Sequence, residues 1–112
     1  MLKKAFPLLF VLGVALISLP ALSPDGLIRQ ITKDPASDYH VKWSPDGKHI
    51  TFDARWNGTP NIFTISLADG DTKRLSQDGM PDFQPNWSLD GSLITFASLR
   101  SGNADIWVKD VK

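Results

Sequence analysis

The sequence contains no cysteine and no glutamate, and its 12 basic and 12 acidic residues leave a formal charge of zero. The absence of cysteine excludes disulfide bonds, thiolate metal sites and a lipid anchor on an N-terminal cysteine. The balanced charge offers no basic stripe for nucleic acid, so no nucleic-acid partner is expected. Every acidic residue is aspartate, which favours turns over helices, and eight glycines and eight prolines favour turns as well. The 112 residues therefore predict one small all-β domain of short strands and tight turns.

The first segment has the features of an export signal. Two lysines precede an uncharged, apolar run of signal-peptide length. We expect residues 1–23 to be a signal peptide, cleaved after Ser23 or after Ala21. The alternative is an uncleaved anchor, because residues 5–22 reach the lower limit of a membrane span. Both interpretations predict an exported, periplasmic domain over residues 24–112, attached to the inner membrane if the signal is retained.

The remaining sequence is one repeat written twice. Residues 25–68 align with residues 69–112 at an offset of 44 without a gap, and thirteen positions are identical. Chance would give roughly two or three identities, so the period is real. The identities include Trp43/Trp87, Ser44/Ser88, Asp46/Asp90, Gly47/Gly91, Ile50/Ile94, Phe52/Phe96 and Ile62/Ile106.

Turn residues divide each repeat into short strands. The first repeat is predicted to form strands over residues 40–43, 49–54, 61–66 and 72–76. Apolar and polar residues alternate over residues 49–54, which predicts a strand with one buried face. The second repeat, from Gln84 to Val111, lacks the fourth strand. A strand of the fourth type is predicted over residues 27–32, before the first repeat.

Four strands in about 44 residues, with Trp-Ser and Asp-Gly markers, are typical of a β-propeller blade. Trp43 and Trp87 are expected to be buried between blades, because their rings are large enough to fill the wedge there. The stretches Trp43-Ser-Pro-Asp-Gly-Lys-His-Ile-Thr-Phe52, Trp87-Ser-Leu-Asp-Gly-Ser-Leu-Ile-Thr-Phe96 and Arg100-Ser-Gly-Asn-Ala-Asp-Ile-Trp107 resemble the blades of TolB-like propellers. The resemblance implies a ring of six blades, of which this chain holds about two. Similar blades also occur in the propeller domains of prolyl-oligopeptidase-like and tricorn-like peptidases.

The sequence shows no arrangement for catalysis. It has no Gly-x-Ser-x-Gly elbow, and nothing orients a nucleophile toward its two histidines, His40 and His49. The aspartates do not follow the spacing of a calcium-binding loop and are interpreted as turn residues. We therefore predict no catalytic residues, no metal site and no cofactor.

Loops after the second and fourth strands of each blade are expected to emerge on one rim of the ring. They carry the arginine, tryptophan and methionine side chains that are enriched at interface hot spots. The candidate partner-binding residues are Arg55, Trp56, Asn57, Asp78, Met80, Arg100 and Asn103. An alternative remains for three residues: Phe83 and Tyr39 would anchor the loops in the core, and Arg100 would pair with a nearby aspartate.

These observations predict a non-enzymatic, protein-binding module of the bacterial cell envelope. The resemblance implies a peptidoglycan-associated lipoprotein or another envelope protein as the partner. The alternatives are a truncated peptidase propeller and a sugar-binding propeller in which Trp43 and Trp87 stack on the ligand. Two blades cannot close a ring, since propellers need about four. The chain is therefore either a fragment or one unit of a homo-oligomer, in which residues 27–32 complete the last blade of the next copy and three copies form six blades.

Overall fold

The computed structural model describes residues 28–76 and 79–112. The chain divides into two units, Met1–Lys33 and Asp34–Lys112, and the second unit contains all the strands described below. The predicted signal peptide lies outside the described residues, as does Leu27. The predicted strand over residues 27–32 is wrong, because its described part contains no strand and only an isolated bridge at Arg29. Among the described residues no helix is long and apolar enough to cross a membrane.

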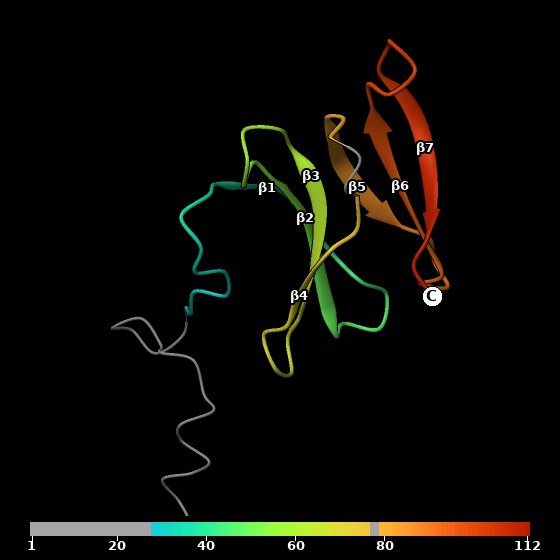
Figure 1. Ribbon diagram of the computed structural model, residues 1–112. Helices are drawn as coiled ribbons and strands as arrows, with labels where there is room; N and C mark the ends of the chain where they lie inside the picture. The colour runs from blue at the N-terminus through green and yellow to red at the C-terminus, as the bar shows by residue number, and fades with distance from the viewer. Residues whose placement is uncertain (1–27, 77–78) are drawn as a thin grey trace, which may run out of the picture. The chain divides into compact units, whose positions relative to one another are not determined.

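The first repeat forms an antiparallel sheet of four strands in chain order (Figure 1). The strands are β1 (Asp38–Trp43), β2 (His49–Ala54), β3 (Asn61–Ser66) and β4 (Thr72–Arg74). The fourth strand is two residues shorter than predicted, but its pairing continues past Arg74. The Leu75 N–H donates to the Ile62 carbonyl at 2.7 Å, and the Ile62 N–H donates to Ser76 Oγ at 2.9 Å. We call this sheet the first blade.

The second repeat forms a three-stranded antiparallel sheet, the second blade. Its strands are β5 (Asp82–Trp87), β6 (Leu93–Ser98) and β7 (Asp105–Asp110). Strand β5 lies against β1, β2 and β3, so the two sheets are stacked. These are the first three strands of the repeat, as the sequence predicted.

The Ser-x-Asp-Gly turns are held by side chains as well as by the backbone. In the second blade the Asp90 carboxylate accepts hydrogen bonds from the Ser88 and Ser92 hydroxyls, both at 2.7 Å, and from the Ser92 N–H at 3.0 Å. The following Gly91 has a φ of 75°, which glycine adopts without steric cost. The Ser92 N–H and the two hydroxyls lower the pKa of Asp90 from 3.8 to about 2.

The hydrogen bonds of this turn should make the stability of the domain sensitive to acid. Because the pKa of Asp90 is lower in the folded state, its contribution is complete above pH 3.8 and is lost as the pH falls through about 2. We expect the urea midpoint to fall more between about pH 5 and pH 2.5 in the natural chain than in the Asp90→Asn variant. Asp71→Asn is the control, because the exposed Asp71 side chain accepts no hydrogen bond among the described residues. Equal acid sensitivity in the natural chain and the Asp90→Asn variant would contradict the assignment.

Both blades carry a β-bulge at the same position of the repeat. The register shifts between Tyr39 and Lys42 in β1 and between Phe83 and Asn86 in β5. A non-glycine residue with positive φ lies at each bulge, His40 at 51° and Gln84 at 58°. The backbone conformation is thus a property of the repeat, retained although the two side chains differ.

The bulge gives a prediction at Gln84. Glycine removes the steric cost of positive φ, so Gln84→Gly should raise the free energy of unfolding by up to about 1 kcal/mol. Valine, which is β-branched, should lower it by about 1–2 kcal/mol. Urea denaturation of both variants measures the difference. If valine is tolerated as well as glycine, the left-handed conformation at Gln84 is not maintained in solution.

The core lies between the two blades. Ile62, Ile94 and Phe96 are buried in one cluster, and Trp87 packs against it. The burial predicted for Trp43 is wrong: its side chain is 63% exposed. The difference follows from position, because Trp87 lies on the face of the second blade that meets the first. Trp43 lies at the corresponding point of the first blade, away from this contact.

The first blade is buried on both faces at β2, which corrects the prediction of a single buried face. Thr51 is 0% exposed and Asp53 is 4% exposed. The sheet register places Asp53 beside Ile62, on the side of the inter-blade cluster. The polar side of β2 is therefore covered by the second blade. On the other side, Phe52 and Phe63 are both 1% exposed and stack with ring centroids 5.8 Å apart.

Candidate functional site

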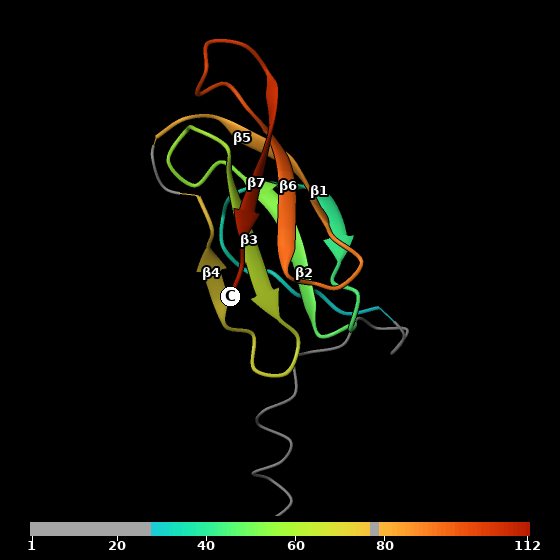
Figure 2. The same cartoon turned by 90° about the vertical axis from the view of Figure 1, so that its right-hand side faces the viewer.

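Three loops gather at one end of the two blades, as both views show (Figures 1 and 2). We call this end the loop rim; it comprises residues 55–60, 79–81 and 99–104. Backbone bonds tie the loops together, because the Asp82 N–H donates to Pro60 O at 2.8 Å and the Leu99 N–H to Pro81 O at 3.1 Å. The described candidate binding residues all lie on the loop rim, whereas Asp78 lies outside the described residues.

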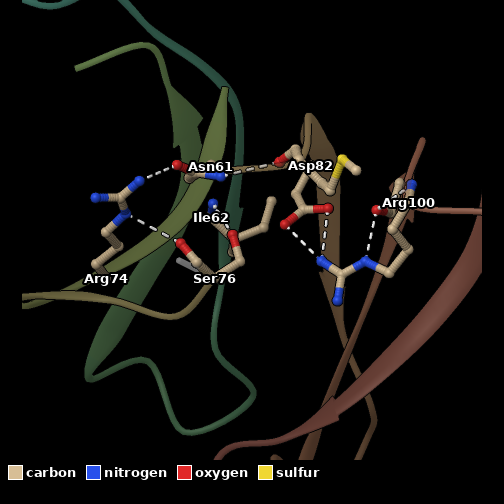
Figure 3. A network of polar contacts seen from close by, with 8 residues as sticks. Asn61, Ile62, Arg74, Ser76, Asp82 and Arg100 are labelled. Carbon is tan, nitrogen blue, oxygen red and sulfur yellow. Dashed lines mark hydrogen bonds and ion pairs between the residues drawn. The ribbon is translucent and has the colours of Figure 1, made fainter. Parts of the chain in front are cut away.

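Arg100 is engaged within the second blade (Figure 3). Its Nη2 lies 2.9 and 2.8 Å from the two carboxylate oxygens of Asp82, and its Nε donates to Ser98 Oγ at 2.8 Å. The guanidinium also lies over the rings of Phe96 and Trp107, 5.4 and 5.2 Å from their centroids. The expected alternative for Arg100, an ion pair with a nearby aspartate, is therefore present.

A second polar group holds the edge of the first blade (Figure 3). Arg74 donates from Nε to Ser76 O at 3.0 Å, and its Nη2 hydrogen-bonds to Asn61 Oδ1. Asn61 Nδ2 in turn donates to Met80 O at 3.2 Å. These bonds connect β3 and β4 to the segment that leads into the second blade. Arg74 and Arg100 thus both serve the fold.

Arg55 differs from Arg74 and Arg100 in its contacts. It is exposed at the start of the β2–β3 loop, and it makes no hydrogen bond or ion pair within residues 28–76 and 79–112. Its side chain borders two hollows. One, of about 720 Å³, is lined by residues of both blades, among them Tyr39, His40, Phe83 and Leu99. The other, of about 460 Å³, lies beside Asp34, Trp56 and Asn57.

The aromatic side chains at these hollows are only partly buried. Trp56 packs on Phe63 with ring centroids 4.2 Å apart, yet it remains 42% exposed. Tyr39 is 51% exposed, whereas Phe83 is partly buried. The loop rim therefore presents aromatic surface on either side of a free guanidinium.

The floor of the larger hollow is polar. Asp53 Oδ1 lies 2.7 Å from His40 Nδ1 and accepts a hydrogen bond from the Gln84 N–H at 3.0 Å. The Asp53 side chain is 6% exposed and that of His40 is 46% exposed. Asp53 thus connects the bulges of β1 and β5 beneath the hollow.

The remaining predicted residues lie further out on the rim. Met80 is 40% exposed and Asn103 is exposed. Tyr39, His40 and Leu99 line the larger hollow and were not among the predicted binding residues. The alternative in which Tyr39 anchors a loop in the core is wrong, because its side chain is exposed at the hollow. A signal was present for His40 and Asp53, because the second repeat has Gln84 and Ala97 at their positions.

Two of the aspartates that were considered as calcium ligands accept backbone hydrogen bonds within turns instead. The Asp71 N–H donates to Asp69 Oδ1, and the Ala36 N–H donates to Asp34 Oδ1, both at 2.9 Å. No group of three or more potential metal ligands gathers in the described part of the chain.

Two equivalent antiparallel sheets, stacked through a shared core, define adjacent blades of a β-propeller. The family model of the TolB beta propeller domain matches residues 21–112. The chain belongs to this family, and the resemblance inferred from the repeats is confirmed.

Solved structures agree with this assignment. A protein of Agrobacterium tumefaciens described as a TolB is 32% identical, with a TM-score of 0.67 over 74% of this chain. TolB from Acinetobacter baumannii is 27% identical, with a TM-score of 0.69 over 79% of this chain. The matches span only 30% and 22% of those two proteins. The comparison with curated proteins finds no match.

Proposed function

We propose that the chain is a non-catalytic protein-binding module of the bacterial cell envelope, with the loop rim as its binding surface. The observation that carries the proposal is Arg55, an exposed guanidinium without an internal partner, between two hollows with aromatic walls. Arginine, tyrosine and tryptophan are the side chains most enriched at interface hot spots. A partner that offers a carboxylate to Arg55 and an apolar side chain to the larger hollow fits this surface.

The polar side chains near the hollows support binding rather than catalysis. A hydrolytic site needs a nucleophile hydrogen-bonded to its base. In the described residues the His40 ring contacts Asp53, and no hydroxyl hydrogen-bonds to it. Ser44 Oγ is engaged in its own turn, where it donates to Asp46 at 2.6 Å.

Family membership and the predicted signal peptide support a periplasmic location. The resemblance to TolB-like propellers makes a peptidoglycan-associated lipoprotein the first candidate partner. Its binding is a separate question from the use of the loop rim, and both can be tested in one titration.

The test uses isothermal titration calorimetry with a purified peptidoglycan-associated lipoprotein of the same bacterium. We expect Arg55→Glu to weaken binding at least about tenfold, because a carboxylate replaces the guanidinium at the centre of the surface. Lys48→Glu makes the same change of charge at the opposite end of the blades and should leave the affinity unchanged. Equal affinity of the natural chain and Arg55→Glu would exclude the loop rim, and no binding by the natural chain would exclude this partner.

A further inference from the structure

Asn57 and Gly58 form the only Asn-Gly pair of the sequence, and they lie in the β2–β3 loop of the loop rim. The other three asparagines precede residues that carry a side chain, namely Ile62, Trp87 and Ala104. A side chain on the following residue hinders the approach of its backbone nitrogen to the asparagine amide, and glycine has none. Asparagine is a thermolabile residue, and it is most reactive where glycine follows it.

Neither residue of this pair is held by the fold. Asn57 and Gly58 are both exposed, and within residues 28–76 and 79–112 neither makes a hydrogen bond. A methyl group added to the α-carbon of Gly58 would lie within 4 Å of no atom beyond the neighbouring residues. The Asn57 side chain can therefore turn toward the Gly58 nitrogen without breaking a hydrogen bond.

The glycines of comparable turns are held instead. At the offset of 44, the Gly102 N–H donates to Leu99 O at 2.9 Å. The glycine N–H is also a donor in each of the three described Asp-Gly turns, those of Gly47, Gly70 and Gly91. In these three turns the aspartate carboxylate accepts a backbone N–H as well. Both groups that would have to react with each other are thus engaged elsewhere, unlike those of the Asn-Gly pair.

We propose that Asn57 deamidates spontaneously in the folded protein and that this modification alters the loop rim. The Gly58 nitrogen attacks Cγ of Asn57 and forms a new C–N bond. The side-chain amide nitrogen leaves as ammonia, which takes up the proton of the Gly58 N–H. Water then opens the cyclic succinimide at one of its two carbonyl groups and yields aspartate or isoaspartate. Water is the only co-reactant, and no group is oxidised or reduced.

The modification changes the charge beside Arg55. Arg55 and Asn57 line the same hollow of about 460 Å³. The new carboxylate is ionised at neutral pH and attracts the Arg55 guanidinium, which has no ion pair in the described part of the chain. Isoaspartate also adds a methylene group to the main chain of the loop. Both products therefore compete with a carboxylate of the partner for Arg55; this consequence rests on the proposed function, whereas the deamidation does not.

Mass spectrometry after incubation at mildly alkaline pH tests the chemistry. Trypsin releases Asn57 in the peptide of residues 56–73 and Asn103 in that of residues 101–109, and fragment spectra assign the modified position. Asn103 is the matched control, because it is also exposed on the loop rim but precedes Ala104. We expect conversion at Asn57 to be at least about tenfold faster than at Asn103. Equal rates at the two asparagines would overturn the proposal.

Denaturation tests whether the difference between the turns comes from the fold. In urea the hydrogen bonds of the Asp-Gly turns are lost, so isoaspartate should form faster at Asp90 than in the folded protein. The rate at Asn57 should change by less than about twofold, because its loop is unrestrained in the folded state as well. A rise at Asn57 as large as that at Asp90 would contradict reaction of this residue in the folded protein.

Calorimetry with the peptidoglycan-associated lipoprotein, before and after incubation, tests the consequence for binding. The natural chain should lose affinity by about threefold or more as Asn57 is converted, and Asn57→Asp should bind that weakly without incubation. Asn57→Gln closes a larger ring far more slowly, so its affinity should be the same before and after.

Two results would separate the possible failures. An equal loss of affinity in Asn57→Gln and in the natural chain would show that deamidation of Asn57 is not its cause. A fresh natural chain that does not bind the lipoprotein would contradict the proposed partner and the consequence for affinity, whereas the rates at Asn57 and Asn103 would still decide the modification itself.

Discussion

Replacement of Arg100 by methionine should lower the free energy of unfolding by about 3–5 kcal/mol, because it leaves the Asp82 carboxylate buried without its counter-charge. The Asp82 side chain is 0% exposed, and both of its oxygens accept hydrogen bonds from Arg100. Methionine retains the unbranched stem over Phe96 and Trp107, so most of the loss comes from the missing charge. Urea denaturation at neutral pH measures the effect.

Two controls separate the ion pair from other sources of stability. Arg55→Met removes an arginine that is exposed and has no ion pair among the described residues, and should cost less than about 0.5 kcal/mol. Arg100→Met combined with Asp82→Leu should recover much of the loss, because no unpaired charge remains in the core. If the double variant is less stable than Arg100→Met alone, packing around the guanidinium and not its charge determines the loss.

The repeat made most of the fold predictable. Turn chemistry fixes where each strand starts and ends, and residues 49–54 and 61–66 form strands with the predicted bounds. The predictions of burial were wrong in two places: Trp43 is exposed, and the polar face of β2 is buried. Burial depends on which neighbouring sheet covers a face, and a period of two residues contains no information about that neighbour.

The candidate site was less predictable, because arginines in two similar loops have opposite roles. Arg55 and Arg100 have the same chemistry, and only the buried Asp82 beside Arg100 distinguishes them. Trp56 and Arg100 occupy the same repeat position, and each packs over the aromatic ring of the third strand, Phe63 or Trp107. Trp56 and Arg100 were both predicted to bind a partner, and both also pack on the third strand of their own blade.

The hollow beside Arg55 was missed because its walls come from both blades. Tyr39 belongs to β1, Phe83 to β5 and Leu99 to the loop after β6. No stretch of sequence brings these positions together. Departures from the repeat were the available signal: Asp53 replaces the alanine of the other copy and bonds across the blades to Gln84. Comparison of the repeats for such differences, in addition to identities, would have identified the floor of the hollow.

The two tryptophans of the repeat should respond very differently to truncation. Trp87→Ala removes a ring packed on the inter-blade cluster and should lower the free energy of unfolding by about 3 kcal/mol. Trp43→Ala should cost less than about 1 kcal/mol, because this side chain is 63% exposed.

Urea denaturation of both alanine variants measures the two losses. The two residues occupy the same position of the repeat, so strand propensity and turn chemistry are matched and only their surroundings differ. The difference between the two losses therefore measures what the neighbouring blade contributes to one tryptophan. Equal losses would mean that Trp43 is covered in solution as Trp87 is.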